Sequence, residues 1–266
     1  SRYQDGRFTT FTTQEGLAGD LINDLAEGPE GTLWVATVTG LSRWREGRFE
    51  TIGAERGLTE PQVRKVLIDA NGVVWASVLN LGLMRWDGKS FVNAIPSTKR
   101  QRQEPYCLMR DPAGRIWAGY LGRVLCLNGQ SITSYGRAEG VPNVRITCLA
   151  AVGDGTVWAG TFDQGLYHLQ DGKFLPVRQP NGLSDEAVQA ILEDRERNLW
   201  VGTRVGGLSR LKAGKLATLR IVDETTEVKP MSLAESPGGV FWVGTSGRGL
   251  YRIEGGRAIK EGFTVV

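Results

Sequence analysis

The chain has 266 residues, of which 41% are hydrophobic and 23% are charged, and it carries 32 basic and 29 acidic side chains. This composition predicts a globular domain with an apolar core and excludes an intrinsically disordered chain. The net charge of +3 comes from basic residues scattered along the sequence, so nucleic acid is not an expected partner. No apolar stretch reaches transmembrane length, so we expect no membrane insertion by this segment.

The first residues predict a strand that precedes the first complete repeat. Gln4-Asp-Gly-Arg-Phe8 matches Arg45-Glu-Gly-Arg-Phe49 and Gln170-Asp-Gly-Lys-Phe174, which mark the turn into the outermost strand of later units. We therefore expect residues 1–13 to form an extra outer strand that belongs to a preceding or ring-closing blade.

A tryptophan recurs along the rest of the chain at intervals of 41 or 42 residues. The six positions are Trp34, Trp75, Trp117, Trp158, Trp200 and Trp242. A period in this range is typical of propeller blades, solenoids or arrays. The unit around Trp158 predicts four short strands at 146–152, 157–162, 166–169 and 173–177, joined by turns that include Asp154-Gly155 and Asp171-Gly172. No unit shows a sustained helical period, which disfavours a helical solenoid.

Four-stranded units of this length predict an all-β fold, a β-propeller of six blades with about 42 residues each. We expect residues 1–266 to form a single propeller domain, with each repeat tryptophan packed between adjacent blades. The alternative left open is that the chain is a six-unit segment of a larger seven-bladed or tandem propeller array.

The residues that could act in catalysis or metal binding lie at positions that recur from repeat to repeat, which favours structural roles for them. His168, the single histidine, falls in a position held by Arg43, Arg85, Arg210 and Arg252 in other units. Glu27, Glu193 and Glu235 likewise share one repeated position. No Ser/His/Asp constellation is present, and Cys126 and His168 do not complete a metal-ligand set. We therefore expect no catalytic residue, no metal and no cofactor.

Candidate binding residues lie where the repeats differ, at the connections that meet at one mouth of the central channel. The connection 97–106 is strongly basic and the connection 223–229 is mostly acidic, whereas the other four resemble one another. Arginine and aromatic side chains at this mouth have the chemistry to hold a polar ligand. The predicted ligand-binding residues are Arg64, Tyr106, Tyr120, Arg145, Phe162, Arg204 and Arg248.

The segment Leu199-Trp-Val-Gly-Thr-Arg-Val-Gly-Gly-Leu-Ser-Arg210 resembles the two-component regulator propeller repeat, and Phe241-Trp-Val-Gly-Thr-Ser-Gly-Arg-Gly-Leu-Tyr-Arg252 is nearly as close. The resemblance covers essentially the whole chain. Proteins of this kind are bacterial membrane sensors whose extracytoplasmic propellers, often seven-bladed and in tandem, precede an immunoglobulin-like domain, a membrane span and a kinase or cyclase.

The resemblance implies a non-enzymatic sensor propeller with a periplasmic or extracytoplasmic location. Its ligand would be a polar small molecule, a glycan or a peptide, and its partners would be downstream signalling domains or a homodimer partner. Two alternatives remain open. One is a protein-interaction scaffold, and the other is a lyase similar to streptogramin lyase, a seven-bladed enzyme that uses a histidine, an acidic residue and a divalent metal.

Overall fold

The computed structural model describes residues 1–4, 7–95, 103–177, 183, 185–205, 207–212, 215–219, 221–223, 226–254 and 257–261. The chain divides into two compact units, unit 1 (Ser1–Arg110) and unit 2 (Asp111–Phe263). Within the described ranges the regular structure consists of β-strands and short 3-10 helices. No described helix has the length and apolar character needed to cross a membrane.

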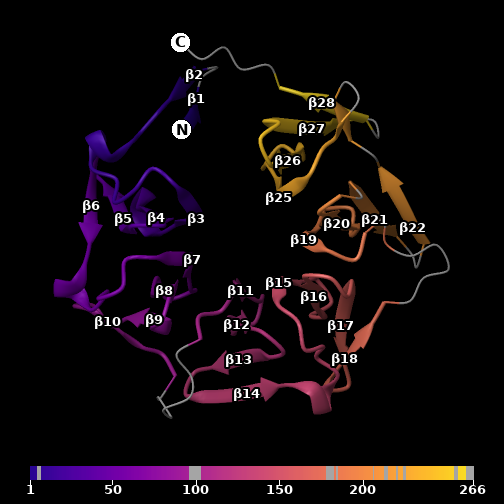
Figure 1. The fold of residues 1–266 in the computed structure, drawn as a ribbon, viewed down its shortest axis with the longest axis horizontal. Coiled ribbons are helices and arrows are strands. Elements are labelled where there is room, and N and C mark those ends of the chain that lie inside the picture. Colours follow the sequence, from indigo (N-terminus) through magenta and orange to yellow (C-terminus); the bar gives the residue numbers. More distant parts are fainter. Residues whose placement is uncertain are drawn as a thin grey trace. The chain divides into compact units, whose positions relative to one another are not determined.

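Six four-stranded sheets follow one another along the chain, and each is a meander in which strands adjacent in sequence pair with one another. The sheets are antiparallel and form the blades of an all-β propeller, which confirms the predicted fold (Figure 1). The four strands predicted around Trp158 are observed within one residue of their predicted ends, as Ile146–Ala151, Val157–Thr161, Leu166–Gln170 and Lys173–Pro176.

Unit 1 contains a short hairpin, blades 1 and 2, and the first strand of blade 3. The hairpin is β1 (Arg2–Gln4) and β2 (Arg7–Thr9), followed by the 3-10 helix η1 (Thr13–Glu15). Blade 1 comprises β3 (Ile22–Glu27), β4 (Leu33–Thr37), β5 (Gly40–Arg45) and β6 (Arg48–Ile52), with η2 (Pro29–Gly31) between β3 and β4. After η3 (Ala54–Arg56), blade 2 comprises β7 (Val63–Ile68), β8 (Val74–Val78), β9 (Gly82–Trp86) and β10 (Phe91–Asn93), and β11 (Cys107–Arg110) follows.

Unit 2 contains the rest of blade 3 and blades 4 to 6. Blade 3 continues with β12 (Ile116–Gly119), β13 (Val124–Asn128) and β14 (Ser131–Tyr135), and η4 (Arg137–Glu139) leads to blade 4, β15 (Ile146–Ala151), β16 (Val157–Thr161), β17 (Leu166–Gln170) and β18 (Lys173–Pro176). Blade 5 is β19 (Val188–Glu193), β20 (Leu199–Thr203), β21 (Leu208–Lys212) and β22 (Lys215–Leu219). A small hairpin, β23 (Val222–Asp223) and β24 (Thr226–Glu227), precedes blade 6, β25 (Pro230–Glu235), β26 (Phe241–Thr245), β27 (Leu250–Glu254) and β28 (Arg257–Lys260).

The second strand of each blade carries the repeat tryptophan, and in three blades an aspartate fixes the indole. In each case the indole Nε1–H donates to a carboxylate at the end of the preceding strand: Trp75 to Asp69 at 3.0 Å, Trp117 to Asp111 at 2.8 Å and Trp200 to Asp194 at 2.7 Å. A buried indole N–H needs such an acceptor. The aspartate and tryptophan therefore act as one structural element in these blades.

Blade 4 departs from this arrangement because Val152 replaces the aspartate. The Trp158 Nε1–H is buried, and none of the described residues supplies it with a hydrogen-bond acceptor. Its ring packs against the imidazole of His168 at a centroid distance of 5.3 Å. Arg43 covers Trp34 and Arg210 covers Trp200 from the matching position, at 5.7 and 5.5 Å. The single histidine therefore lies in a position where side chains cover the indole.

Tryptophans also pack between neighbouring blades within a unit. In unit 1 the Trp34 ring of blade 1 lies 6.5 Å from Trp86 and 6.4 Å from Phe91, both of blade 2. In unit 2, Trp200 of blade 5 packs against Phe241 of blade 6 at 4.8 Å. These contacts agree with the expected place of the indoles between blades.

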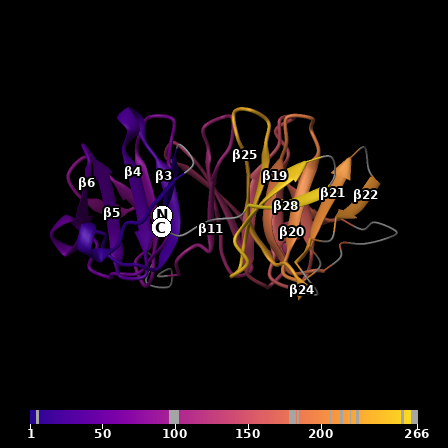
Figure 2. The ribbon, with the colours of Figure 1, turned by 90° about the horizontal axis from the view of Figure 1, so that it is seen from above.

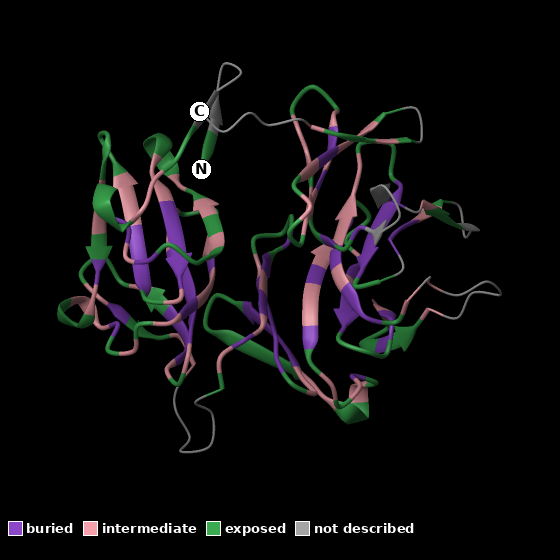
Figure 3. Ribbon diagram, turned by 45° about the horizontal axis from the view of Figure 1, so that its top comes forward, coloured by how far each residue is buried: buried purple, intermediate pink, exposed green. Residues whose placement is uncertain are grey.

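The repeated glutamate position also links blades within unit 2. The Glu193 carboxylate accepts from the backbone N–H of Gly153 at 2.6 Å, and the Glu235 carboxylate accepts from that of Arg195 at 3.1 Å. Each glutamate therefore holds the first turn of the preceding blade, which is the structural role expected for this position. Buried residues concentrate in the middle strands of the blades (Figure 3).

The strands of each blade stand side by side, as blade 1 shows with β3 to β6 (Figure 2). Five inner strands, β3, β7, β15, β19 and β25, begin with a one-residue register shift. The extra residues are Asn23, Arg64, Thr147, Gln189 and Met231. A bulge turns the side chain of its extra residue away from the regular sheet alternation. In blade 2 the residue placed in this way is Arg64, one of the predicted site residues.

Candidate functional site

A repeated backbone hydrogen bond builds one end of the blades, which we call the rim. The residue after the second strand donates its N–H to the carbonyl of the residue before the inner strand of the same blade. The pairs are Val38 to Leu21 (3.1 Å), Leu79 to Gln62 (2.9 Å), Phe162 to Arg145 (3.0 Å), Arg204 to Ala187 (2.8 Å) and Ser246 to Lys229 (3.0 Å). This backbone hydrogen bond recurs in blades 1, 2, 4, 5 and 6, whereas the side chains at these positions differ from blade to blade.

In unit 2 the rim brings together three predicted site residues, Arg145, Phe162 and Arg204. The guanidinium carbon of Arg145 lies 5.4 Å from the centroid of the Phe162 ring, and that of Arg204 lies 5.2 Å from the same centroid. Blade 4 supplies the ring and one arginine, and blade 5 supplies the other. We call these three residues the arginine–phenylalanine cluster.

The cluster is open to solvent and positively charged. Arg145 and Arg204 are exposed, and Phe162 is 37% exposed although it is a large apolar side chain. Among the described residues, no carboxylate lies within ion-pair distance of Arg204. Asp185 is close in the fold, but its carboxylate accepts from the backbone N–H groups of Ala187 (3.2 Å) and Val205 (3.0 Å).

A guanidinium stacked on a ring still presents its in-plane N–H donors to a ligand. Two such groups beside one exposed phenyl ring provide donors for an anion and an apolar surface for the rest of the ligand. Three of the five predicted residues of unit 2 therefore form a contiguous feature, and the sequence had placed Phe162 and Arg204 at matching repeat positions.

The predicted residues of unit 1, Arg64 and Tyr106, also meet. The Arg64 guanidinium lies 5.2 Å from the Tyr106 ring centroid, but its Nη2 is also 3.3 Å from Oε1 of Glu104. Glu104 has the repeat position of Arg145 in blade 4, since each lies 13 residues before the tryptophan of its blade. The sequence analysis did not single out Glu104, and this carboxylate neutralises the charge of Arg64.

Tyr120 and Arg248 are placed differently. Tyr120 is 1% exposed and lies beneath the guanidinium of Arg123, whose carbon is 4.7 Å from the tyrosine ring centroid. Arg248 is half-buried in the loop between β26 and β27. Most of the basic connection at 97–106, namely residues 97–102, lies outside the described residues.

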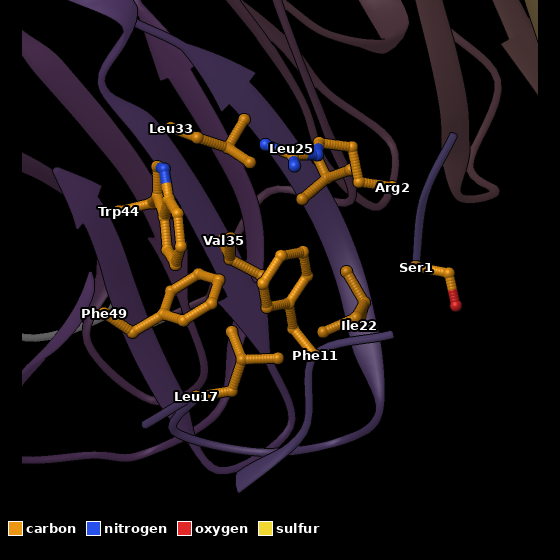
Figure 4. A pocket seen from close by; sticks show the side chains of 10 residues that line it. All are labelled: Ser1, Arg2, Phe11, Leu17, Ile22, Leu25, Leu33, Val35, Trp44 and Phe49. Atoms are coloured by element: carbon orange, nitrogen blue, oxygen red, sulfur yellow. The ribbon is translucent and has the colours of Figure 1, made fainter. Parts of the chain in front are cut away.

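A second feature, an apolar cavity of about 140 Å³, lies on blade 1 within unit 1. Its lining includes Phe11, Leu25, Val35, Trp44 and Phe49, whose side chains converge in Figure 4. Phe11 packs against Trp44 and Phe49 at centroid distances of 5.2 and 5.6 Å. The same repeat positions form the core between blades 1 and 2, so we interpret this cavity as a blade-packing surface rather than as a ligand pocket.

Groups suited to catalysis or metal binding are not gathered in the parts of the chain that the structure describes. No cluster of three or more His, Cys, Asp or Glu side chains there is arranged to hold a metal ion. His168 contacts Trp158 and lies 3.3 Å from Oε1 of Gln170. Burial raises the pKa of the Cys126 thiol, and the nearby Arg115 only partly opposes this.

The six four-stranded antiparallel sheets define the class of the fold, an all-β propeller. Residues 182–204 match the model of the family described as "Two component regulator propeller". The segment includes β19 and β20 of blade 5, and the match confirms the resemblance seen in the sequence. Residues 182–204 therefore match one repeat of this type. No curated protein sequence matches the chain significantly.

Solved structures with the same fold include extracellular domains assigned to two-component systems and a lyase. The chain is similar to the extracellular domain assigned to a hybrid two-component system of B. thetaiotaomicron, with 19% identity, a TM-score of 0.78, and coverage of 96% of this chain and 37% of that one. A second such domain gives 17% identity, a TM-score of 0.59, and coverage of 88% and 39%. An inactive H270A virginiamycin B lyase from Staphylococcus aureus, solved with quinupristin, gives 15% identity, a TM-score of 0.72, and coverage of 88% and 81%.

At these identities the likeness shows the fold alone. The chain spans 37% and 39% of the length of the two extracellular domains. What those whole proteins bind and signal is therefore not transferred to this chain by the comparison.

Proposed function

We propose that the chain is a non-enzymatic recognition propeller, the sensing part of a bacterial receptor of the two-component type, and that it acts outside the cytoplasm. The arginine–phenylalanine cluster carries the proposal, because it is a solvent-open group of ligand-type donors in a position that varies between blades. The repeat match at 182–204 and the two similar ectodomains support the sensor role. Downstream signalling domains or a homodimer partner would complete the receptor.

The chemistry of the cluster favours a ligand that carries a carboxylate or a similar anion. Charge-assisted hydrogen bonds from arginine to a carboxylate are short, directional and frequently bidentate. The exposed Phe162 ring adds an apolar contact for a sugar face, a methylene chain or a side chain. An acidic small molecule, an acidic glycan or an acidic peptide all satisfy these requirements.

A thermal-shift experiment with matched probes tests this proposal. The acidic probes are hexaglutamate and trigalacturonate, and the neutral counterparts are hexaglutamine and galactotriose. A ligand that binds only the folded form raises the unfolding midpoint with the logarithm of its concentration. We expect a saturable rise with an acidic probe and none with its counterpart.

Variants then assign the binding to the cluster. Arg204→Ala and Phe162→Ala should each weaken binding by about tenfold or more, because a charge-assisted bond or an aromatic contact is lost. Arg137→Ala is the matched control, since Arg137 is exposed in the same unit but lies on η4. Equal weakening by Arg137→Ala, or no response to any acidic probe, would contradict the proposed ligand class.

A protein-interaction scaffold is the second candidate function, and exposed apolar side chains favour it. Leu121, Val205 and Met231 of unit 2 are 46%, 49% and 49% exposed at or beside rim positions. A protein partner would bury these side chains together with the cluster. Binding that depends on Val205 and Met231 but is unaffected by Arg204→Ala would favour the scaffold.

The lyase alternative has its own test. Quinupristin incubated with the chain and a divalent metal should remain intact by mass spectrometry if the chain is a recognition domain. Conversion of quinupristin, lost on His168→Ala, would contradict the non-enzymatic proposal.

A further inference from the structure

The exposed apolar side chains in the loops of unit 2 lie at the rim end of the blades. In the described part of unit 2, the exposed large apolar residues are Leu121, Ile132, Phe162, Leu175, Val205, Met231 and Ile259. Four of them lie on strands, whereas Leu121, Phe162 and Val205 lie in the loops between the second and third strands of blades 3, 4 and 5. Three consecutive blades therefore each present one apolar side chain at this end.

Blade 3 reaches the arginine–phenylalanine cluster through its backbone. Leu121 forms an isolated antiparallel bridge with Arg145, and the Gly122 N–H donates to the carbonyl of Val144 at 2.9 Å. The carbonyl of Arg145 accepts from the N–H of Phe162 at 3.0 Å. The backbone therefore holds Arg145 between Leu121 of blade 3 and Phe162 of its own blade.

Blade 5 continues the same series of side chains. The N–H of Gly165, in the blade 4 loop, donates to the carbonyl of Glu186 ahead of blade 5 at 2.8 Å. Val205 follows Arg204 directly, and its N–H is bound by the Asp185 carboxylate at 3.0 Å. An aliphatic residue therefore adjoins each arginine of the cluster. In chain order the residues of this rim row are Leu121, Arg145, Phe162, Arg204 and Val205.

The aliphatic residue of blade 3 is held in a fixed position. Leu121 and Gly122 form a two-residue turn that is closed by a bond from the Tyr120 N–H to the Arg123 carbonyl at 2.8 Å. Gly122 has φ of 64°, and an added Cβ would lie 2.8 Å from Oδ1 of Asn143. Leu121 is nevertheless 46% exposed. An exposed apolar residue on such a constrained turn loses little conformational freedom when a ligand covers it.

On the basis of the proposed function of this site, we propose that its ligand is an extended peptide that presents an apolar, two acidic and another apolar side chain on one face. The acidic side chains pair with Arg145 and Arg204, in the manner of arginine clusters that recognise acidic motifs. The outer side chains cover Leu121 and Val205 and remove apolar surface from water.

An extended peptide has the spacing for these contacts. Its side chains alternate between two faces, so residues two apart share a face and are separated by about 6.6–6.8 Å. Two carboxylates at this separation suit two guanidinium groups whose carbons lie 5.4 and 5.2 Å from one ring centroid. The next side chain outward on the same face meets the aliphatic residue beside each arginine.

The aliphatic residues of the rim row favour a peptide over an acidic glycan. A sugar has a flat C–H face that suits the ring of Phe162, but its hydroxyl groups find no hydrogen-bond partner on the side chain of Leu121 or Val205. Covering these side chains with a glycan would therefore remove hydroxyl groups from water without compensation. A peptide places methyl groups there instead.

Two heptapeptides of identical composition and charge test the proposal by isothermal titration calorimetry with the whole chain. In extended acetyl-Leu-Ser-Glu-Gly-Glu-Ser-Leu-amide the leucines share a face with the glutamates, and in acetyl-Ser-Leu-Glu-Gly-Glu-Leu-Ser-amide they lie on the other face. We expect the first peptide to bind at least about tenfold more tightly than the second, because only the first buries its leucines on the rim row.

Variants assign that difference to the aliphatic residues. Leu121→Ser and Val205→Ser should each reduce the difference between the two peptides and leave the affinity of the second peptide unchanged. Ile132→Ser is the matched control, because Ile132 is 40% exposed on the outer strand β14. It should leave both affinities unchanged.

The contrary outcomes distinguish the ligand class from the proposed function. Equal affinity for the two peptides, lost on Arg204→Ala, would overturn the peptide proposal and leave anion recognition by the cluster in place. Tighter binding of trigalacturonate than of either peptide, unaffected by Leu121→Ser, would overturn it in favour of an acidic glycan. Failure of both peptides and of trigalacturonate to bind would overturn the peptide proposal together with the anion-binding role of the cluster.

Discussion

Replacing Asp111 by alanine is expected to destabilise unit 2 through one buried hydrogen-bond group. Asp111 is 3% exposed, and its carboxylate accepts from Trp117 Nε1 at 2.8 Å, from the Arg115 backbone N–H at 2.9 Å and from Arg115 Nε at 2.6 Å. Trp117 is 1% exposed, so water cannot take over its indole N–H. Charge-assisted bonds contribute about 1.5–3 kcal/mol, and an orphaned buried donor costs about 1–3 kcal/mol.

These contributions overlap, so we expect Asp111→Ala to lower the free energy of unfolding by about 2–4 kcal/mol. Asp111→Asn should lower it less, because an amide oxygen still accepts one bond. The assay is urea denaturation at pH 7 followed by tryptophan fluorescence. Asp87→Ala is the control, since Asp87 is exposed and bonds only backbone N–H groups of its own turn. If Asp111→Ala and Asp87→Ala unfold at the same urea concentration, the structural role of the Asp–Trp element is refuted.

Three further predictions concern stability. Gly140→Ala should lower the free energy of unfolding, measured by urea denaturation, by about 1–3 kcal/mol more than Gly136→Ala does. Gly140 has φ of 84°, and an added Cβ would lie 2.3 Å from the Phe174 carbonyl oxygen, while Gly136 has φ of −126°. Equal midpoints would contradict it. Trp158→Ala should lower the free energy of unfolding by about 3 kcal/mol, which is less than the loss for Trp117→Ala, because the indole N–H of Trp158 has no acceptor among the described residues. An equal or larger loss for Trp158→Ala would contradict this prediction. The pH dependence of the free energy of unfolding should contain two opposite contributions, one from Asp111 and one from Asp24. Burial would raise the pKa of Asp111, but bonds from Trp117 and Arg115 outweigh it and lower the pKa, so its stabilisation is present above the usual aspartate pKa and is lost as the pH falls below it. Burial raises the pKa of Asp24, so its contribution decreases as the pH rises, and Asp24→Asn should remove that decrease in midpoints measured from pH 3 to 7.

The fold was predictable because the repeat supplies its own internal comparison. Six tryptophans at a nearly constant interval, together with Gly-containing turns, indicated the number of blades and the ends of the four strands around Trp158. The same comparison explained His168, whose position other blades fill with arginines that cover an indole. Repetition thus separates structural residues from variable ones without any homologous sequence.

The site was only partly predictable, because the sequence does not show which side chains meet. It placed Phe162 and Arg204 at matching positions, but the contacts of Arg145 and Arg204 with the Phe162 ring depend on the rim hydrogen bonds between loop and strand. It did not indicate that Glu104 neutralises Arg64, or that Tyr120 is buried beneath Arg123. Both depend on side-chain directions set by bulges and turns, which have no strong local signature.

The most direct test of the proposed function follows the two arginines themselves during ligand binding. Arginine Nε–H resonances of the ¹⁵N-labelled chain are assigned by the loss of single signals in Arg145→Lys, Arg204→Lys and Arg137→Lys, and hexaglutamate is then titrated in. If the arginine–phenylalanine cluster recognises anions, the Arg145 and Arg204 signals shift along one saturable curve while the Arg137 signal stays in place. Saturable binding that leaves both cluster signals unmoved, or shifts all exposed arginines alike, would contradict it.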